Sequence, residues 1–596
     1  MLTNNILAQT TRQLQGPDWF ILVCYFVVML GIGLYFYRFM KGLKDYFTGG
    51  NTIPWWLSGV SYWMSSFSAF AFIAYSGLAY KYGLLGVTVY WVTVPATLFS
   101  VLFFATRWRR ARLTSPVEYI ETRYSPLLRQ VFAWQGIPVK IIDDALKIVA
   151  IGAFISVSLG IGMGQAMFWS SVIMLAYTFM GGLWAVMVTD FVQFVVMMAA
   201  VLVLFPLAFH EAGGFGQVWH NSPPGFWYPV NEKFGWIYIL TTVLMYCLSY
   251  SVNWSLVQRF YCVPTEKDAR KVGWLVVFLN IIGPPLMFAP AMAARHFLGE
   301  GVADKAVYPL MCAKLLPAGM FGLVVAAMFS ATMSMLSGDY NVCASVLTND
   351  VYKRLIRPQS SNRELVVVGR LMTLLVGIVS LGIAFLMYRG EGESLFQNMV
   401  TLFSIAVAPV AVPMLGGLVS RRLSNGSSVV GFCIGLGLGL TLFLTLPREI
   451  EWQGMTWQRE TVILLCSLVA TLAATLIAMP FFPISPAAQA RVDEFQARLS
   501  APIGTLEEDK LPAGASGSAV LSPFRIVGTT IVLTGVMMLA IQPWIKTTGG
   551  SDPRTGTLAL VLNLIIGGGL VVLGAIMIWV TRKPRSAPTP TGAVEP

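Results

Sequence analysis

The chain has 596 residues, of which 56% are hydrophobic and 11% are charged. Soluble domains contain roughly 45–50% apolar and about 25% charged residues. A mean hydropathy of +0.69 over this length cannot be hidden in a water-soluble core. These values exclude a soluble globular protein and indicate a polytopic membrane protein.

The net charge of +12 does not indicate nucleic-acid binding, because the basic residues lie in short clusters between long apolar runs. This arrangement is the one that orients membrane helices. The seven cysteines include no CxxC motif and the three histidines are dispersed, so neither a disulfide framework nor a zinc site is indicated. We expect no organic cofactor and no obligate protein partner.

Apolar runs long enough to cross a bilayer predict fifteen helices. The first run follows a polar segment and has no small-residue cleavage site, so we expect it to be retained as a helix rather than removed as a signal peptide. The expected spans are residues 18–38, 53–80, 84–106, 131–161, 163–182, 186–209, 234–258, 272–298, 317–347, 365–388, 395–420, 427–446, 460–482, 524–544 and 557–580.

The distribution of basic residues predicts the orientation of the chain. With an outside N-terminus, 26 Lys and Arg residues lie on the cytoplasmic side and 10 on the outside. Cytoplasmic loops carry the excess of Lys and Arg, so we expect an outside N-terminus and a cytoplasmic C-terminus in a cell membrane, most simply a bacterial inner membrane. The cytoplasmic linker 483–523 contains a charged stretch, Arg491–Arg498, that fits a short surface helix, and the basic tail after Trp579 is expected to be disordered.

Small polar residues inside apolar spans favour transport over a purely structural bundle. The span 53–80 carries a series of hydroxyl-bearing side chains, among them Ser68, and the span 234–258 carries Asn253. Interrupted membrane helices free backbone carbonyls that can coordinate a cation, and irregular backbone is tolerated where it lines a cavity. The alternative interpretation is that the serines only permit close helix packing.

Acidic residues within the spans are the second indication. Asp190 and Asp339 have no partner nearby in the sequence, and an unpaired charge at this depth costs several kcal/mol, so both are functional candidates. Asp143, Asp144 and Lys147 are spaced for pairing within one helix, which offers a structural alternative to a functional role. The sequence leaves open whether Asp339 faces a site or a neighbouring helix.

Several motifs resemble those of the sodium:solute symporter family. The stretch AVYPLMCAKLLPAGMFGLVVAAMFSATMSMLSGDYNVCASVLTNDVYKRL (306–355) is similar to the eighth core helix of that family. Three further segments agree in order and spacing: PWW…G.S in the span 53–80, GG..AV..TD..Q at 181–193, and N…..QR at 253–259. The segment 396–422 is similar to the tenth core helix.

The resemblance implies an all-α fold with a core of ten helices, built as two inverted five-helix repeats with broken first helices. The repeats would occupy residues 53–210 and 234–422. Residues 1–52 would form the N-terminal tail and an extra helix. Residues 423–596 would form about four further helices, with the linker 483–523 and the disordered tail.

The resemblance also implies where sodium binds. Carried over by position, the ligands are the backbone carbonyls of Met64, Phe67 and Ala331 and the hydroxyl of Ser334, with Asp190 as an auxiliary charge. These oxygens are suitable ligands for a hard cation.

One residue departs from the family pattern at this site. Met335 replaces a second hydroxyl residue, and a thioether is a poor ligand for a hard cation. Water, Thr332 or Asp190 could compensate, or the protein could be coupled to protons instead of sodium.

The solute is less well defined. Ala71 and Tyr90 match positions where sugar-carrying members have glutamine and glutamate, Thr93 replaces a serine, Asn253 is kept, and Gln397 is a candidate on the tenth core helix. Asp143 and Lys147 could contact a hydroxylated or charged solute, and Trp254 could stack on a sugar ring. The residues expected to contact solute are therefore Ser68, Ala71, Tyr90, Thr93, Asp143, Lys147, Asn253, Trp254 and Gln397.

The sequence predicts a secondary active transporter, not an enzyme, that carries sodium and a small polar solute by alternating access. A carbohydrate or sugar acid is the preferred solute. The alternatives are a proton-coupled symporter, an amino-acid or carboxylate symporter, and a sensor that keeps the transporter fold. A membrane enzyme and a channel are less consistent with the motifs, because no catalytic acid–base motif appears and broken helices suit a gated binding site.

Overall fold

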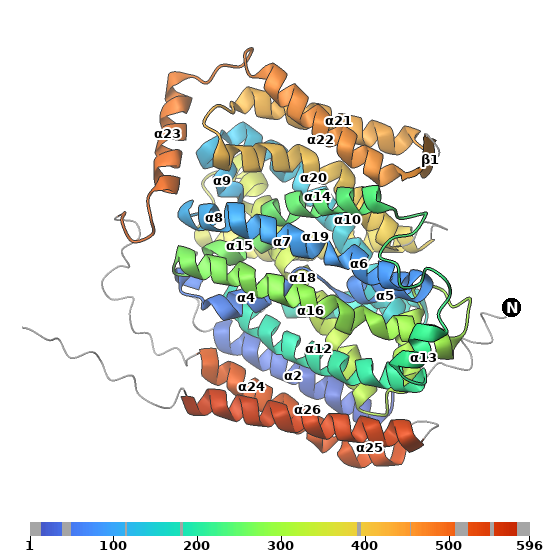
Figure 1. Cartoon of the computed structure of the whole chain (residues 1–596). Helices are drawn as coiled ribbons and strands as arrows, with labels where there is room; N and C mark the ends of the chain where they lie inside the picture. Colours follow the sequence, from blue (N-terminus) through green and yellow to red (C-terminus); the bar gives the residue numbers. More distant parts are fainter. Residues whose placement is uncertain are drawn as a thin grey trace, which may run out of the picture.

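The computed structural model describes residues 14–37, 49–113, 116–178, 183–389, 395–452, 455–506, 523–548 and 553–580. Within these residues the chain is helical apart from one two-stranded hairpin (Figure 1). The predicted polar N-terminal segment and the predicted disordered tail lie outside the described residues.

The elements of the N-terminal half are α2 (Gly16–Tyr37), η1 (Gly49–Asn51), α4 (Trp55–Met64), α5 (Ala69–Tyr82), α6 (Leu84–Trp91), α7 (Thr93–Ser100), η2 (Val101–Ala105), α8 (Thr106–Arg110), α9 (Pro116–Arg123), α10 (Pro126–Leu159), α11 (Met163–Thr178), α12 (Leu183–Glu211) and α13 (Phe215–His220). The remaining elements are α14 (Trp236–Val252), α15 (Trp254–Tyr261), α16 (Glu266–Leu298), α17 (Val307–Leu315), α18 (Met320–Val346), η3 (Leu347–Ile356), α19 (Asn362–Arg389), α20 (Leu395–Val419), α21 (Asn425–Thr445), β1 (Glu449–Trp452), β2 (Met455–Gln458), α22 (Arg459–Ala478), α23 (Pro486–Ser500), α24 (Pro523–Ala540), α25 (Gln542–Thr548) and α26 (Pro553–Val580).

The high helical content follows from the hydrocarbon environment of the apolar segments. In hydrocarbon every backbone polar group must be satisfied internally, and a single helix does this by itself. The described residues contain 11 helices long and apolar enough to span a membrane, or up to 14 spans when each of three bent pairs counts as one. Thirteen of the fifteen predicted spans each coincide with one of these helices or pairs, and the spans 131–161 and 163–182 share the remaining pair.

The predicted count differs because α10 and α11, bent by 117° relative to each other, form one of the three pairs. With its 34 residues α10 is about 50 Å long, enough to cross by itself. The fifteenth crossing therefore stays a prediction.

Two spans are broken by short polar residues that end one helix and begin the next. Between α4 and α5 the chain bends by 59°, and the extended residue Ser68 caps α5 by accepting a hydrogen bond from the Phe70 N–H at 3.2 Å. Between α14 and α15 the bend is 55°, and extended Asn253 caps α15 by accepting from the N–H groups of Ser255 and Leu256. Such caps satisfy backbone donors that the break leaves without helical partners.

The helices around the two breaks pack in a reciprocal way. The first broken pair, α4–α5, packs against α16, and the second broken helix, α14, packs against α7. In the chain, α7 comes after the first break and α16 comes after the second. Each broken helix therefore packs against a helix from the other half of the core, as expected of two interlocked repeats. The boundaries 53–210 and 234–422 stay predictions.

Further helices flank this core on opposite sides (Figure 1). The pair α21–α22 packs against α20, whereas the pair α24–α26 packs against α12. The hairpin β1–β2, which the sequence analysis did not predict, joins α21 to α22.

The predicted helix within the linker 483–523 is confirmed as α23. It lies at one end of the bundle, across the direction of the spanning helices (Figure 1). Its apolar face is buried against α8 and α9, with the ring of Phe495 5.5 Å from that of Tyr119.

Candidate ion and solute site

The break between α4 and α5 brings backbone carbonyls against α18. The carbonyls of Met64 and Phe67 lie in the break, both residues are buried, and neither carbonyl accepts a hydrogen bond from the described turns or caps. The Thr332 hydroxyl on α18 accepts a hydrogen bond from the Ala69 N–H at 3.1 Å, which ties α18 to the first residue of α5. The sequence predicted this meeting of the first and eighth core helices.

Asp190 links three helices at the same level. From α12, its carboxylate accepts hydrogen bonds from Ser334 on α18 at 2.6 Å and from Ser61 on α4 at 2.5 Å. Asp190 is fully buried, and Ser334 is 2% exposed. Because the Ser334 hydroxyl donates its proton to Asp190, the lone pairs of its oxygen remain available to a cation.

Arg259 is a member of this site that the sequence analysis did not single out. Its guanidinium is buried, lies 3.7 Å from the Asp190 carboxylate, and donates to the hydroxyls of Ser61 at 3.2 Å and Ser65 at 3.0 Å. Arg259 is one of the 26 basic residues assigned to the cytoplasmic side, although it closes the N…..QR segment at 253–259. The guanidinium and the two hydroxyl donors offset part of the cost of burying the Asp190 carboxylate beside Ser334.

A cavity of about 70 Å³ lies between the two broken helices. Its wall combines the α4–α5 break with side chains of α6, α10, α14, α15, α18 and α20. This volume is small compared with the roughly 300–1,000 Å³ of sites for drug-sized ligands. A sugar-sized solute therefore requires the surrounding helices to move apart, as alternating access provides.

The cavity gathers six of the nine predicted solute residues: Ser68, Ala71, Tyr90, Asp143, Lys147 and Asn253. Thr93, Trp254 and Gln397 are not among its lining residues. Trp254 packs instead against the small cluster of Ala133, Ile137 and Val346. The roles proposed for these three residues stay predictions, as do those of the six.

Met335 lines the cavity from α18. It therefore offers an apolar wall at the place where the family pattern has a second hydroxyl.

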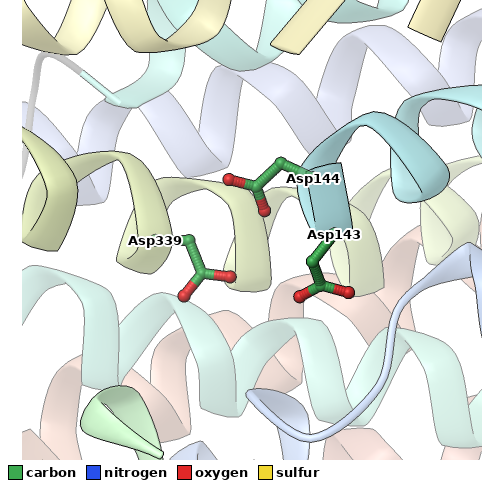
Figure 2. Close-up of side chains that lie close together, drawn as sticks. All are labelled: Asp143, Asp144 and Asp339. Carbon is green, nitrogen blue, oxygen red and sulfur yellow. The ribbon is translucent and has the colours of Figure 1, made fainter. Parts of the chain in front are cut away.

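A cluster of five charged side chains adjoins the cavity, and we call it the α10–α18 charge cluster: Lys140, Asp143, Asp144, Lys147 and Asp339. The Lys147 ammonium lies 2.9 Å from Asp143, 3.0 Å from Asp144 and 2.8 Å from Asp339. Figure 2 shows the three carboxylates, two carried by α10 and one by α18. Lys140 adds an ion pair with Asp339 at 2.6 Å, and the Ser255 hydroxyl donates to Asp339 at 3.1 Å.

This cluster answers two questions that the sequence left open. The pairing of Lys147 within its own helix is present, and Asp339 faces α10 across a helix–helix contact. Lys140 was missed, although residues 140, 143, 144 and 147 follow the i, i+3, i+4, i+7 spacing of one helix face. The ion pairs of Lys140 and Lys147 with Asp339 join α10 to α18 beside the cavity.

Both broken helices line one cavity, and buried carbonyl oxygens lie in the first break. This arrangement defines an ion-coupled membrane transporter with inverted repeats. The model of the sodium:solute symporter family matches residues 46–435, and the chain belongs to this family. Sodium is accordingly the co-transported ion, and the protein is a multi-pass membrane symporter.

Similar proteins agree with this assignment. The sodium/sialic acid symporter NanT of Aliivibrio fischeri is 24% identical over 435 residues, covering 70% of this chain and 85% of the relative. The sodium/myo-inositol cotransporter 2 of Bos taurus is 27% identical over 479 residues, covering 72% and 70%. A solved structure of a Na⁺-coupled sialic acid symporter, substrate-bound and outward-open, shares the fold with a TM-score of 0.68 at 21% identity and covers 78% of this chain and 98% of that one.

Proposed function

We propose that the protein uses the sodium gradient to drive the uptake of a small hydroxylated solute of the carbohydrate class, a carbohydrate or sugar acid, into the cytoplasm. The lining of the cavity carries this proposal: serine and tyrosine hydroxyls and the Asn253 amide face a space between two broken helices. Relatives named for sialic acid and myo-inositol transport support the same class. The N-terminus lies outside and the C-terminus is cytoplasmic, in keeping with the bias of basic residues.

The sodium site consists of the carbonyls of Met64, Phe67 and Ala331 and the hydroxyl of Ser334, with Asp190 behind them. This set is supported by the hydrogen bond from Ser334 to Asp190 and by the bond that joins the Ala69 N–H to Thr332. A sodium ion held by α4–α5 and α18 stabilises the contact between these helices.

Transport by this protein needs neither covalent chemistry nor an organic cofactor, since the gradient supplies the work. One sodium ion moving inward through 100 mV contributes about 2.3 kcal/mol, or roughly fiftyfold accumulation of solute. When ion and solute are both bound, the two repeats rock around the site and open it to the cytoplasm.

The test is uptake into proteoliposomes under an imposed sodium gradient, with potassium as the control ion and a pH gradient as the rival driving force. Saturable uptake of a labelled sugar or sugar acid that requires inward sodium supports the proposal. Uptake that ignores sodium and follows the pH gradient would make the protein proton-coupled. Flux that does not saturate would indicate a channel, and binding without uptake would indicate a sensor.

A further inference from the structure

The α10–α18 charge cluster carries an unbalanced negative charge. It contains three carboxylates and two ammoniums, so the net charge is −1 when all five groups are ionised. Asp144 is fully buried, and its second oxygen has no hydrogen-bond partner among the described residues. A buried uncompensated charge is unfavourable, so either one carboxyl of the cluster is protonated or a further positive charge lies nearby.

Asp143 is the member of the cluster that brings a carboxylate to the cavity. Among the described residues that line the cavity, Asp143 is the only carboxylate and Lys147 the only ammonium. Three carboxylates within 3.0 Å account for all three N–H donors of Lys147, which leaves none for a solute. Asp143 has Lys147 as its one ion-pair partner within the described chain and keeps an oxygen for the cavity. The charged end of the cavity thus accepts hydrogen bonds and positive charge, and it repels a carboxylate.

Aromatic rings make up much of the rest of the cavity wall. Tyr75 and Tyr90 meet edge to face with ring centres 4.9 Å apart, and Tyr246 and Tyr250 lie 5.5 Å apart. The hydroxyl of Tyr90 is buried and makes no hydrogen bond to a described residue. Aromatic faces attract organic ammonium groups, whereas a hard metal cation prefers a cage of oxygens. The wall therefore suits an amine better than a second sodium ion.

We propose that Asp143 binds a protonated amine of the solute, so that the transported molecule is an amine-bearing, hydroxylated compound such as an amino sugar and not a sugar acid. This inference rests on the proposed function, because it takes the same cavity as the solute site. The ammonium neutralises the cluster, the tyrosine rings flank it, and the serine hydroxyls face the remaining hydroxyls of the solute.

Three probes with one ring and different charge test the proposal: glucosamine, glucose and glucuronate. Binding to the detergent-purified full-length protein is measured by titration in sodium. We expect glucosamine to bind about 30-fold more tightly than glucose, because losing one partner of a desolvated charge pair has an effect of this order, and we expect no binding of glucuronate.

Variants at Asp143 separate direct contact from a general effect of charge. Asp143→Asn weakens glucosamine binding about 30-fold and leaves glucose unchanged, whereas Asp143→Glu retains the preference for the amine. The control, Glu449→Gln, removes a carboxylate from a half-exposed pair with Lys233 far along the chain and changes neither affinity.

Preferential binding of glucose or glucuronate, or binding of none of the three probes, overturns the assignment of an amine to Asp143. A fall in the Hill coefficient for sodium in Asp143→Asn, with no preference for glucosamine in the wild type, also overturns it and places a second sodium ion there. If glucose or glucuronate binds preferentially, or if the Hill coefficient for sodium falls in Asp143→Asn, sodium-driven uptake persists and the proposed function stands. Loss of sodium dependence for every probe instead removes the proposed function.

Discussion

Replacing Lys147 by methionine tests how the α10–α18 charge cluster is held together. The substitution keeps most of the side-chain volume and removes an ammonium that lies within 3.0 Å of three carboxylates. Lys140 then remains as the single cation of the cluster, and the net charge changes from −1 to −2. Breaking a buried ion pair by removing one partner costs about 3–5 kcal/mol, and here three carboxylates lose the same partner, so we expect the upper end of that range.

The assay is thermal unfolding of the detergent-purified variants, with wild type in parallel. Lys233→Met provides the matched control, because Lys233 pairs with Glu449 at 2.8 Å but both side chains are 40% or more exposed, and such pairs contribute about 0–1 kcal/mol. A second substitution, Asp144→Asn, restores part of the stability lost in Lys147→Met, since it removes one of the unpaired charges. Equal melting temperatures for Lys147→Met and Lys233→Met would refute the reasoning.

Three further predictions concern Arg259, the cap of α15 and the ion pairs of Glu121 on α9. Arg259→Lys lowers the affinity for sodium several-fold, because the ammonium of lysine cannot replace a planar guanidinium that donates to two serines and lies beside Asp190. An unchanged sodium titration contradicts this prediction. Asn253→Ala removes the cap of α15 and destabilises the protein by about 1 kcal/mol, whereas an unaltered melting temperature shows that the cap is dispensable. Burial raises the pKa of Glu121, but hydrogen bonds from Arg354 and Arg129 outweigh burial, so the pKa is lowered. The stabilising contribution of Glu121 is therefore present above pH 4.5 and is lost as the pH falls through the lowered pKa. Glu121→Gln makes the melting temperature less dependent on pH in this acid range.

The spans and the breaks were predictable because both depend on local sequence. Long apolar runs form helices in a bilayer wherever they occur, and every predicted span falls on a helix or on part of a bent pair, with the spans 131–161 and 163–182 sharing one pair. Ser68 and Asn253 are short polar residues of the kind that cap helices, so the sequence placed both interruptions in the correct spans. The linker helix α23 was likewise visible as a charged stretch between proline-rich segments.

The partners of the buried charges were not predictable, because they come from distant parts of the chain. Asp339 is paired with Lys147, which lies 192 positions earlier, and no pattern within either helix specifies that contact. Arg259 was counted as a cytoplasmic residue because a rule based on basic residues at span ends does not distinguish an exposed arginine from one turned inward against Asp190. Trp254 was expected at the cavity as an aromatic residue that could stack on a sugar ring, but it packs against Ala133, Ile137 and Val346, and no local pattern specifies those partners.

Sodium-dependent thermal stabilisation of the purified protein tests most directly whether the α4–α5 break and α18 form the cation site. Wild type is compared with Ser334→Ala and with Ser330→Ala, a buried serine one turn earlier on α18 that hydrogen-bonds with Tyr25 instead of Asp190. We predict that sodium, and not potassium, raises the melting temperature of wild type and Ser330→Ala, and that Ser334→Ala loses this response. Equal sodium responses in all three proteins, or none in the wild type, would contradict a sodium site at Ser334.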